Sequence, residues 1–182
     1  MKKIILSTVL AIAGLAAQAQ NQANQNAAAD QSTKLALSNA IDISFYSMYY
    51  GGTQTMTFNN VNDYANGVTT GWQILIVKSN KNYDVSVKTN AANFTYSGNT
   101  TPAPVMPVSA LNVGLFINNT GGTPSNTFWN KFAPLDEAPQ TLITNGQKGG
   151  FQYFFTRYKA TPGFAYPAGT YTAEVIYTAT QK

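Results

Sequence analysis

The chain has 182 residues, of which 44% are hydrophobic, 13% aromatic and only 10% charged, with a formal net charge of +4. A chain of this length is most simply one domain, and it can bury a real core without help from disulfides or metal. Because it contains neither cysteine nor histidine, Ser-His-Asp and Cys-His nucleophiles, thiolate metal sites and imidazole ligands are all excluded.

Residues 1–19 have the features of a secretory signal peptide. Lys2 and Lys3 precede the apolar run Ile4–Leu15, which is too short to span a bilayer, and Ala17-Gln18-Ala19 is a small-x-small cleavage site. An N-terminal membrane anchor is the alternative, whereas a lipoprotein anchor is excluded because no cysteine follows the site. We therefore expect export to the periplasm, cell surface or extracellular space, with no membrane span in the mature chain.

A polar leader follows at residues 20–34 (QNQANQNAAADQSTK). It has no large apolar side chain, so it cannot bury enough surface to offset the entropy cost of ordering. From residue 35 the pattern changes to period two, and residues 35–182 are predicted to form a single domain. The first strand carries its apolar side chains on one parity: Leu35, Leu37, Ile41, Ile43 and Phe45.

The rest of the chain alternates between short β-type runs and turn sequences. Thr, Tyr, Phe, Val and Ile dominate the runs, and no window of ten or more residues keeps helical periodicity. About ten short strands predict an all-β, antiparallel immunoglobulin-like β-sandwich, with an up-and-down barrel as the alternative. The further predicted strands are Thr53–Phe58, Gly71–Ser79, Tyr83–Val87, Asn93–Ser97, Leu111–Asn118, Thr141–Thr144, Gly150–Tyr158 and Tyr171–Thr178.

The long loop 118–140 holds the candidate ligand-binding residues. Phe128, Trp129 and Phe132 lie there among Asn, Thr, Gly and Pro, and long loops in small domains are often functional. Exposed aromatic rings could stack on the rings of a carbohydrate. The alternative, which we favour, is that these side chains close one end of the core.

Other candidate sites each have a plainer explanation. Asp136-Glu137 is the one adjacent acidic pair, and it is best explained as a solvated loop. The oxygen-rich segment Asn59–Asp63 could hold calcium, but Asx turns explain it better. An aromatic run could form a sugar-stacking platform, although a core strand is favoured. In this run Phe151, Tyr153, Phe155 and Tyr158 would line one face of the strand, with Phe154 and Arg157 on the opposite face.

One resemblance concerns the end of the chain. Residues 167–178 (PAGTYTAEVIYT) resemble the closing strand of bacterial surface immunoglobulin-like domains, namely the spore-coat-U and chaperone–usher pilin group and the WxL cell-wall-binding domain. Residues 35–40 (LALSNA) and 71–74 (GWQI) are similar to the opening strand and the G-W strand of WxL domains. The cleavage region resembles that of Bacteroidota. The resemblance implies a fold and a surface location but no binding residues.

Together these features predict a secreted, non-enzymatic surface protein with a structural or adhesive role, such as a fibre or pilus-type subunit whose partner is another copy of itself. A carbohydrate- or matrix-binding module is the alternative, with cell-surface polysaccharide as its partner. We expect no catalytic residues, no metal and no cofactor, and scattered basic residues argue against a nucleic-acid partner. Leu35 to Phe45 is either the first strand of a self-complete domain, which is favoured, or an assembly strand donated to a neighbour.

Overall fold

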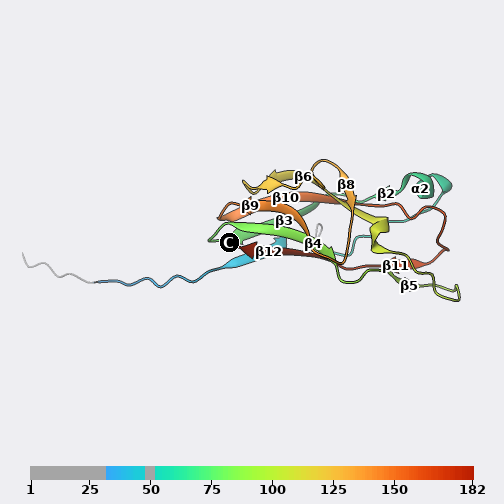
Figure 1. Cartoon of the computed structure of the whole chain (residues 1–182), viewed down its shortest axis with the longest axis horizontal. Helices are drawn as coiled ribbons and strands as arrows, with labels where there is room; N and C mark the ends of the chain where they lie inside the picture. The colour runs from blue at the N-terminus through green and yellow to red at the C-terminus, as the bar shows by residue number, and fades with distance from the viewer. Residues whose placement is uncertain (1–31, 48–51) are drawn as a thin grey trace, which may run out of the picture. The chain divides into compact units, whose positions relative to one another are not determined.

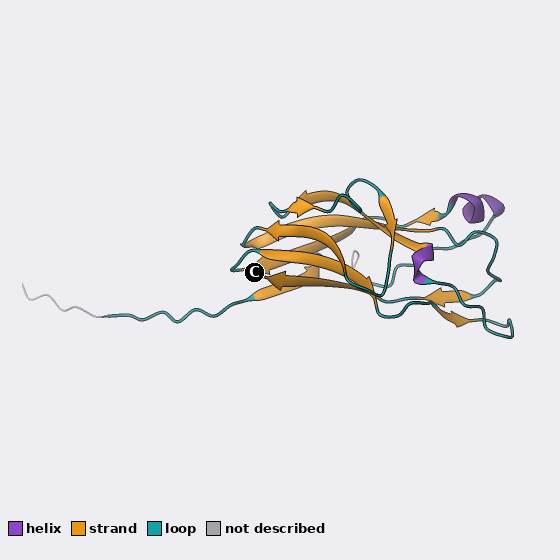
Figure 2. Ribbon diagram, viewed as in Figure 1, coloured by secondary structure: helices purple, strands orange, loops and turns teal. Residues whose placement is uncertain are grey.

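Twelve strands dominate the part of the chain that the computed structural model describes, residues 32–47 and 52–182 (Figure 1, Figure 2). The predicted signal peptide and most of the leader lie outside the described residues. Residues Ser38–Lys182 form one unit, and Met1–Leu37 is grouped apart from it. Neither helix in the described residues has the length and apolar character needed to cross a bilayer. The prediction of an all-β, antiparallel sandwich is confirmed.

The larger sheet, which we call sheet A, has six strands in the order β1-β3-β10-β6-β8, with β2 also paired to β10. Each pairing is antiparallel. The register of β10 against β6 shifts between Phe155 and Thr156, a bulge that increases the local twist. The strands of sheet A are β1 (Ile41–Phe45), β2 (Val68–Thr69), β3 (Gln73–Ser79), β6 (Leu111–Asn119), β8 (Phe132–Pro134) and β10 (Gly149–Ala160).

The second sheet, sheet B, has four strands in the order β12-β4-β9-β7. Since β3 and β4 are consecutive in the chain but belong to different sheets, the turn between them crosses from one layer to the other. The strands of sheet B are β4 (Tyr83–Thr89), β7 (Thr123–Pro124), β9 (Gln140–Gly146) and β12 (Val175–Gln181). The remaining elements are the β5 (Thr95–Ser97) and β11 (Thr170–Thr172) pair, helix α2 (Val61–Asn66) and the 3-10 turn η1 (Val108–Ala110).

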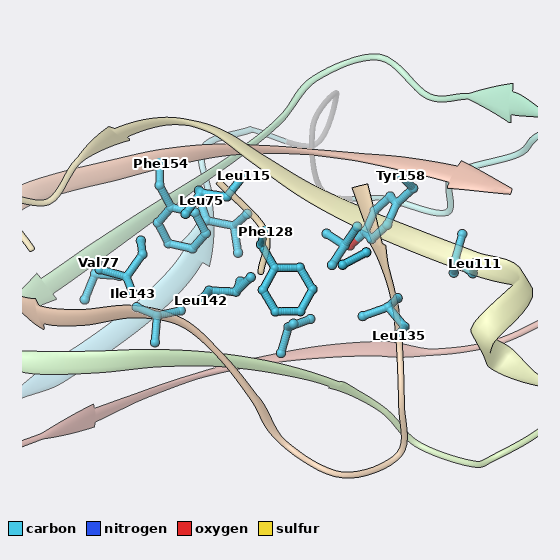
Figure 3. Packing of buried hydrophobic residues seen from close by; sticks show 14 of the residues in the cluster. Leu75, Val77, Leu111, Leu115, Phe128, Leu135, Leu142, Ile143, Phe154 and Tyr158 are labelled. Carbon is cyan, nitrogen blue, oxygen red and sulfur yellow. The ribbon is translucent and has the colours of Figure 1, made fainter. Parts of the chain in front are cut away.

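The core lies between the two sheets because each strand turns alternate side chains inward. In β4, Tyr83, Val85 and Val87 are fully buried, whereas Asp84, Ser86 and Lys88 between them are not. Figure 3 shows Leu75, Val77 and Phe154 of sheet A above Leu142 and Ile143 of sheet B, with Phe128 between the layers. Burial of these side chains is the main contribution to the stability of the fold.

Two predicted strands differ from the structure. Thr53–Phe58 has alternating burial but pairs with no described strand. A period-two pattern indicates extended backbone with one buried side, but it does not indicate that a neighbouring strand is present. The first strand begins at Ile41, because Leu35 and Leu37 are 81% and 91% exposed and have no core to face.

Side-chain hydrogen bonds join the start of β1 to the end of β12. The Asn80 side chain, in the turn between β3 and β4, accepts from the Ala40 amide at 2.9 Å and donates to the Ser38 carbonyl at 2.7 Å. The Gln181 amide donates to the Ala40 carbonyl at 2.8 Å and to Asn80 Oδ1 at 3.0 Å. The Ala40 carbonyl also accepts from the Asn80 backbone amide at 3.1 Å, so these side chains reinforce the end of the β1–β3 pairing.

Candidate functional site

The three loop aromatics predicted as a ligand site do not share one surface. Phe128 is 1% exposed and lies in the core (Figure 3). Its backbone carbonyl accepts from the Leu115 amide at 3.0 Å, and this bond fixes the loop against β6. Trp129 is half-buried against the core, whereas Phe132 on β8 contacts Phe116 at a centroid distance of 5.3 Å. For Phe128 the structure agrees with the core alternative, and a ligand role for the other two stays a prediction.

The predicted assembly strand is divided by the structure into two parts. Leu35 and Leu37 are exposed and lie in no strand. Ile41, Ile43 and Phe45 form the inward-facing parity of β1, which pairs in antiparallel register with β3 of the same chain. Ile43 packs against the core. This pairing is the arrangement expected of a self-complete domain.

Strands β1 and β12 are the neighbouring edges of the two sheets. The Phe45 and Tyr177 rings meet edge-to-face at 6.1 Å, and within the described residues β12 pairs with β4 alone. The inward-facing Val175, Tyr177 and Ala179 are only partly buried where they pack against the core. Apart from the Gln181 bond that ties the end of β12 to Ala40, no described strand pairs with the side of β12 next to β1, which we call the open edge.

The Tyr177 hydroxyl is a polar group that lies near the open edge. It bonds to the Tyr158 hydroxyl at 2.8 Å and to Thr156 Oγ1 at 3.2 Å. Burial raises the pKa of Tyr177 to about 12, although these hydrogen bonds act in the opposite direction. Burial also raises the pKa of Tyr158 well above its ordinary value. These hydroxyls are therefore protonated at neutral pH and act as structural hydrogen-bonding groups.

A second surface corresponds in part to the sugar-stacking platform that the sequence offered only as the less favoured alternative. We define the aromatic face as six rings on the outer side of sheet A: Trp72, Phe116, Phe132, Phe151, Tyr153 and Phe155. Successive centroids are 5.3–6.1 Å apart. Trp72 is 41% exposed and Phe151 56% exposed, and the other four rings are half-buried.

The aromatic face corrects the core interpretation of the β10 aromatic run. Phe154, Thr156 and Tyr158 point into the core, so the intervening parity of β10 faces outward. Tyr158 therefore lies on the buried side with Phe154, opposite Phe151, Tyr153 and Phe155. Arg157 lies with the rings, and its guanidinium carbon is 5.0 Å from the Trp72 ring centroid. A strand with large apolar residues on both parities cannot reveal which parity is buried.

The polar candidates serve local structure. Asn60 Oδ1 accepts from the amides of Asn62 and Asp63, and Asp63 Oδ2 accepts from the amides of Asn59 and Asn60, which forms a capping box at the start of α2. The predicted turn at this segment is thus a helix start. Asp136 is exposed and accepts from the Ala138 amide at 3.1 Å. No group of three or more potential metal ligands occurs in residues 32–47 and 52–182.

Comparisons with known proteins give little further information. No protein-family model matches the chain, and no curated protein matches it. A solved structure of a chaperone–usher pilus is similar over 86% of this chain and 99% of its own chain, with 9% sequence identity and a TM-score of 0.35. Likeness at this level carries no functional inference. The resemblance to spore-coat-U proteins, pilins and WxL domains therefore stays a prediction.

Proposed function

We propose that this chain is an exported, non-enzymatic surface protein with a structural or adhesive role, and that its copies join by strand addition to form a fibre. The observation that carries this proposal is the open edge. There β12 has no partner strand on one side among residues 32–47 and 52–182, and its Val175, Tyr177 and Ala179 side chains are only partly covered. A second chain that paired with β12 would satisfy the backbone groups and cover these side chains together.

The physical basis is the behaviour of unpaired sheet edges. A free edge presents a row of N–H and C=O groups and can bind an extended segment, whose alternate side chains then fill apolar positions. The segment that precedes β1 has the required pattern, since Leu35 and Leu37 continue the inward parity of Ile41 and Ile43. In an isolated chain these two leucines are exposed. A neighbouring copy would give them a core to contact.

A pair of double variants tests the assembly proposal. We expect Leu35→Asp with Leu37→Asp to abolish assembly, because charged side chains cannot enter apolar positions without a large cost. The fold should be unchanged, since both leucines are exposed. Light scattering measures assembly, and circular dichroism measures folding.

The matched control is Ala36→Asp with Ser38→Asp, which adds the same charge on the opposite parity and should leave assembly intact. Wild-type assembly by the Leu35/Leu37 variant would contradict the proposal. Ile41→Asp with Ile43→Asp is expected to unfold the domain, because Ile43 already packs against the core of its own chain.

The export part of the proposal has its own test. N-terminal sequencing of protein recovered outside the cytoplasm should begin at or near Gln20, because Ala17-Gln18-Ala19 is the cleavage sequence. Recovery of chains that still begin with Met1 from the cell envelope would instead indicate a membrane anchor.

A further inference from the structure

We infer that the aromatic face of sheet A binds an acidic polysaccharide in an extended conformation. This inference goes beyond assembly and does not depend on it, because the open edge uses the inward side of β1 and β12. The aromatic face uses the outward side of β10 and its neighbours.

The two outer faces of the sandwich differ strongly in chemistry. On sheet B, the outward side chains of β4 are Asp84, Ser86 and Lys88, and those of β12 include Thr178 and Thr180. A face with such polar side chains is typical of a solvent-exposed surface. On sheet A the same positions carry six aromatic rings. Trp72 and Phe151 are exposed and the other four rings are half-buried, and exposed apolar patches on a protein surface often mark interaction sites.

The arrangement of the rings suits a chain-like ligand. They follow β10 from Phe151 through Tyr153 to Phe155 and continue through Trp72 to Phe116 and Phe132. The spacing between successive centroids, 5.3–6.1 Å, is comparable with the length of one sugar residue along a polysaccharide. Aromatic rings can stack on the C–H faces of sugars while hydroxyl groups remain in water.

The charges around the rings select an acidic ligand. Arg157 lies against Trp72, and its Nε donates to the Thr70 carbonyl at 3.0 Å. This bond orients the guanidinium, whose planar group of donors matches a carboxylate. Within the described residues one ion pair is found, and it joins Lys182 to Asp84. Arg157 therefore forms no ion pair with a carboxylate of the described residues.

The other cations on sheet A strengthen this selection. Lys78 and Lys159 also lie on the outward parity, and Lys131 is exposed next to Phe132. The acid on the outward side of the sheet A strands is Asp42, which pairs in register with Lys78 on β1 and β3. The face therefore carries excess positive charge at the end that holds Trp72 and Arg157.

A titration with polygalacturonate, a polymer of uronic acid, tests the inference. The chain has two tryptophans, so Trp129→Phe leaves Trp72 as the sole indole reporter. We expect a saturable change in Trp72 fluorescence, which calorimetry on the unsubstituted protein should match. Neutral dextran should bind at least about tenfold more weakly, since it lacks the charge-assisted bond to Arg157.

Matched variants locate the site and its charge preference. Arg157→Gln should weaken polygalacturonate binding about tenfold, whereas Lys88→Gln, which removes one positive charge from the outer face of sheet B, should leave it within about twofold. Tyr153→Ala should weaken binding of the polymer by a similar factor, because one stacking ring is lost. Circular dichroism checks that each variant is folded.

Three results would overturn the inference. The first is absence of saturable binding, and the second is equal binding of dextran and polygalacturonate. The third is an equal effect of Arg157→Gln and Lys88→Gln. Concentration-dependent light scattering that needs no polysaccharide and disappears in Trp72→Ala would instead assign the aromatic face to contacts between copies of the chain.

Discussion

Replacement of Phe128 by alanine is expected to lower the free energy of unfolding by about 3–5 kcal/mol, the usual cost of removing a large side chain from a core. The ring is 1% exposed and lies between the two sheets. The Leu115–Phe128 backbone bond prevents the loop from moving inward to fill the space. Denaturant unfolding measures the loss, which should appear as a lower midpoint with an unchanged slope.

The adjacent residue is the control for this prediction. Trp129 is half-buried at the margin of the core, so Trp129→Ala should cost clearly less than Phe128→Ala, although tryptophan is the larger side chain. If Trp129→Ala destabilises the protein more, then the loop is held by Trp129 and the burial seen for Phe128 does not describe the protein in solution.

Tyr83→Phe is expected to remove part of the sensitivity of the fold to alkali. The Tyr83 hydroxyl is buried and has no hydrogen-bond partner within the part of the chain that the structure describes, and burial raises the pKa of Tyr83 to about 12 from an ordinary 10.0. Between these values the unfolded chain loses its proton and the folded chain keeps it, so stability falls as pH rises. A difference of this size corresponds to at most about 3 kcal/mol, present below pH 10 and progressively lost as the pH rises towards 12.

Unfolding curves at several pH values test this prediction. At pH 7 Tyr83→Phe should be neutral or stabilising by about 1 kcal/mol, because it removes an unsatisfied polar group. Near pH 12 the variant should exceed the wild type by several kcal/mol. Some alkaline sensitivity should remain, since burial also raises the pKa of Tyr177 to about 12. An unchanged pH dependence would mean that Tyr83 reaches water in the folded state.

The all-β class could be predicted because a strand with one solvent-exposed face and one buried face has alternating polar and apolar residues in its own sequence. In β4, Tyr83, Val85 and Val87 alternate with polar residues, and the structure buries that parity. Thr53–Phe58 has a similar pattern but no described partner strand. Pairing depends on residues far away in the chain, and no local pattern encodes it.

The sequence placed the β10 rings in the core, and offered an exposed platform only as the alternative, for a related reason. In β10, Tyr153 and Phe155 alternate with Phe154 and Tyr158, so both faces of the strand are equally apolar in sequence. Trp72 and Phe116 lie far from β10 in the chain and join its rings only through the strand order of sheet A. The candidate loop residues, by contrast, were close in sequence, and the structure separates Phe128 from Phe132 between core and surface.

The Gln181 hydrogen bond has a consequence for the order of folding. It joins Gln181 to Ala40, which lies 141 positions earlier in the chain. Closing so long a loop costs more chain entropy than closing a hairpin, and such distant contacts form late in all-β proteins. During synthesis β1 and β3 can pair early, whereas β4 must wait for the C-terminal residues before β12 covers its edge. The domain is therefore complete only after its last strand has formed. A chain that lacked the last few residues would lose the hydrogen bond between Gln181 and Ala40 that joins β12 to β1.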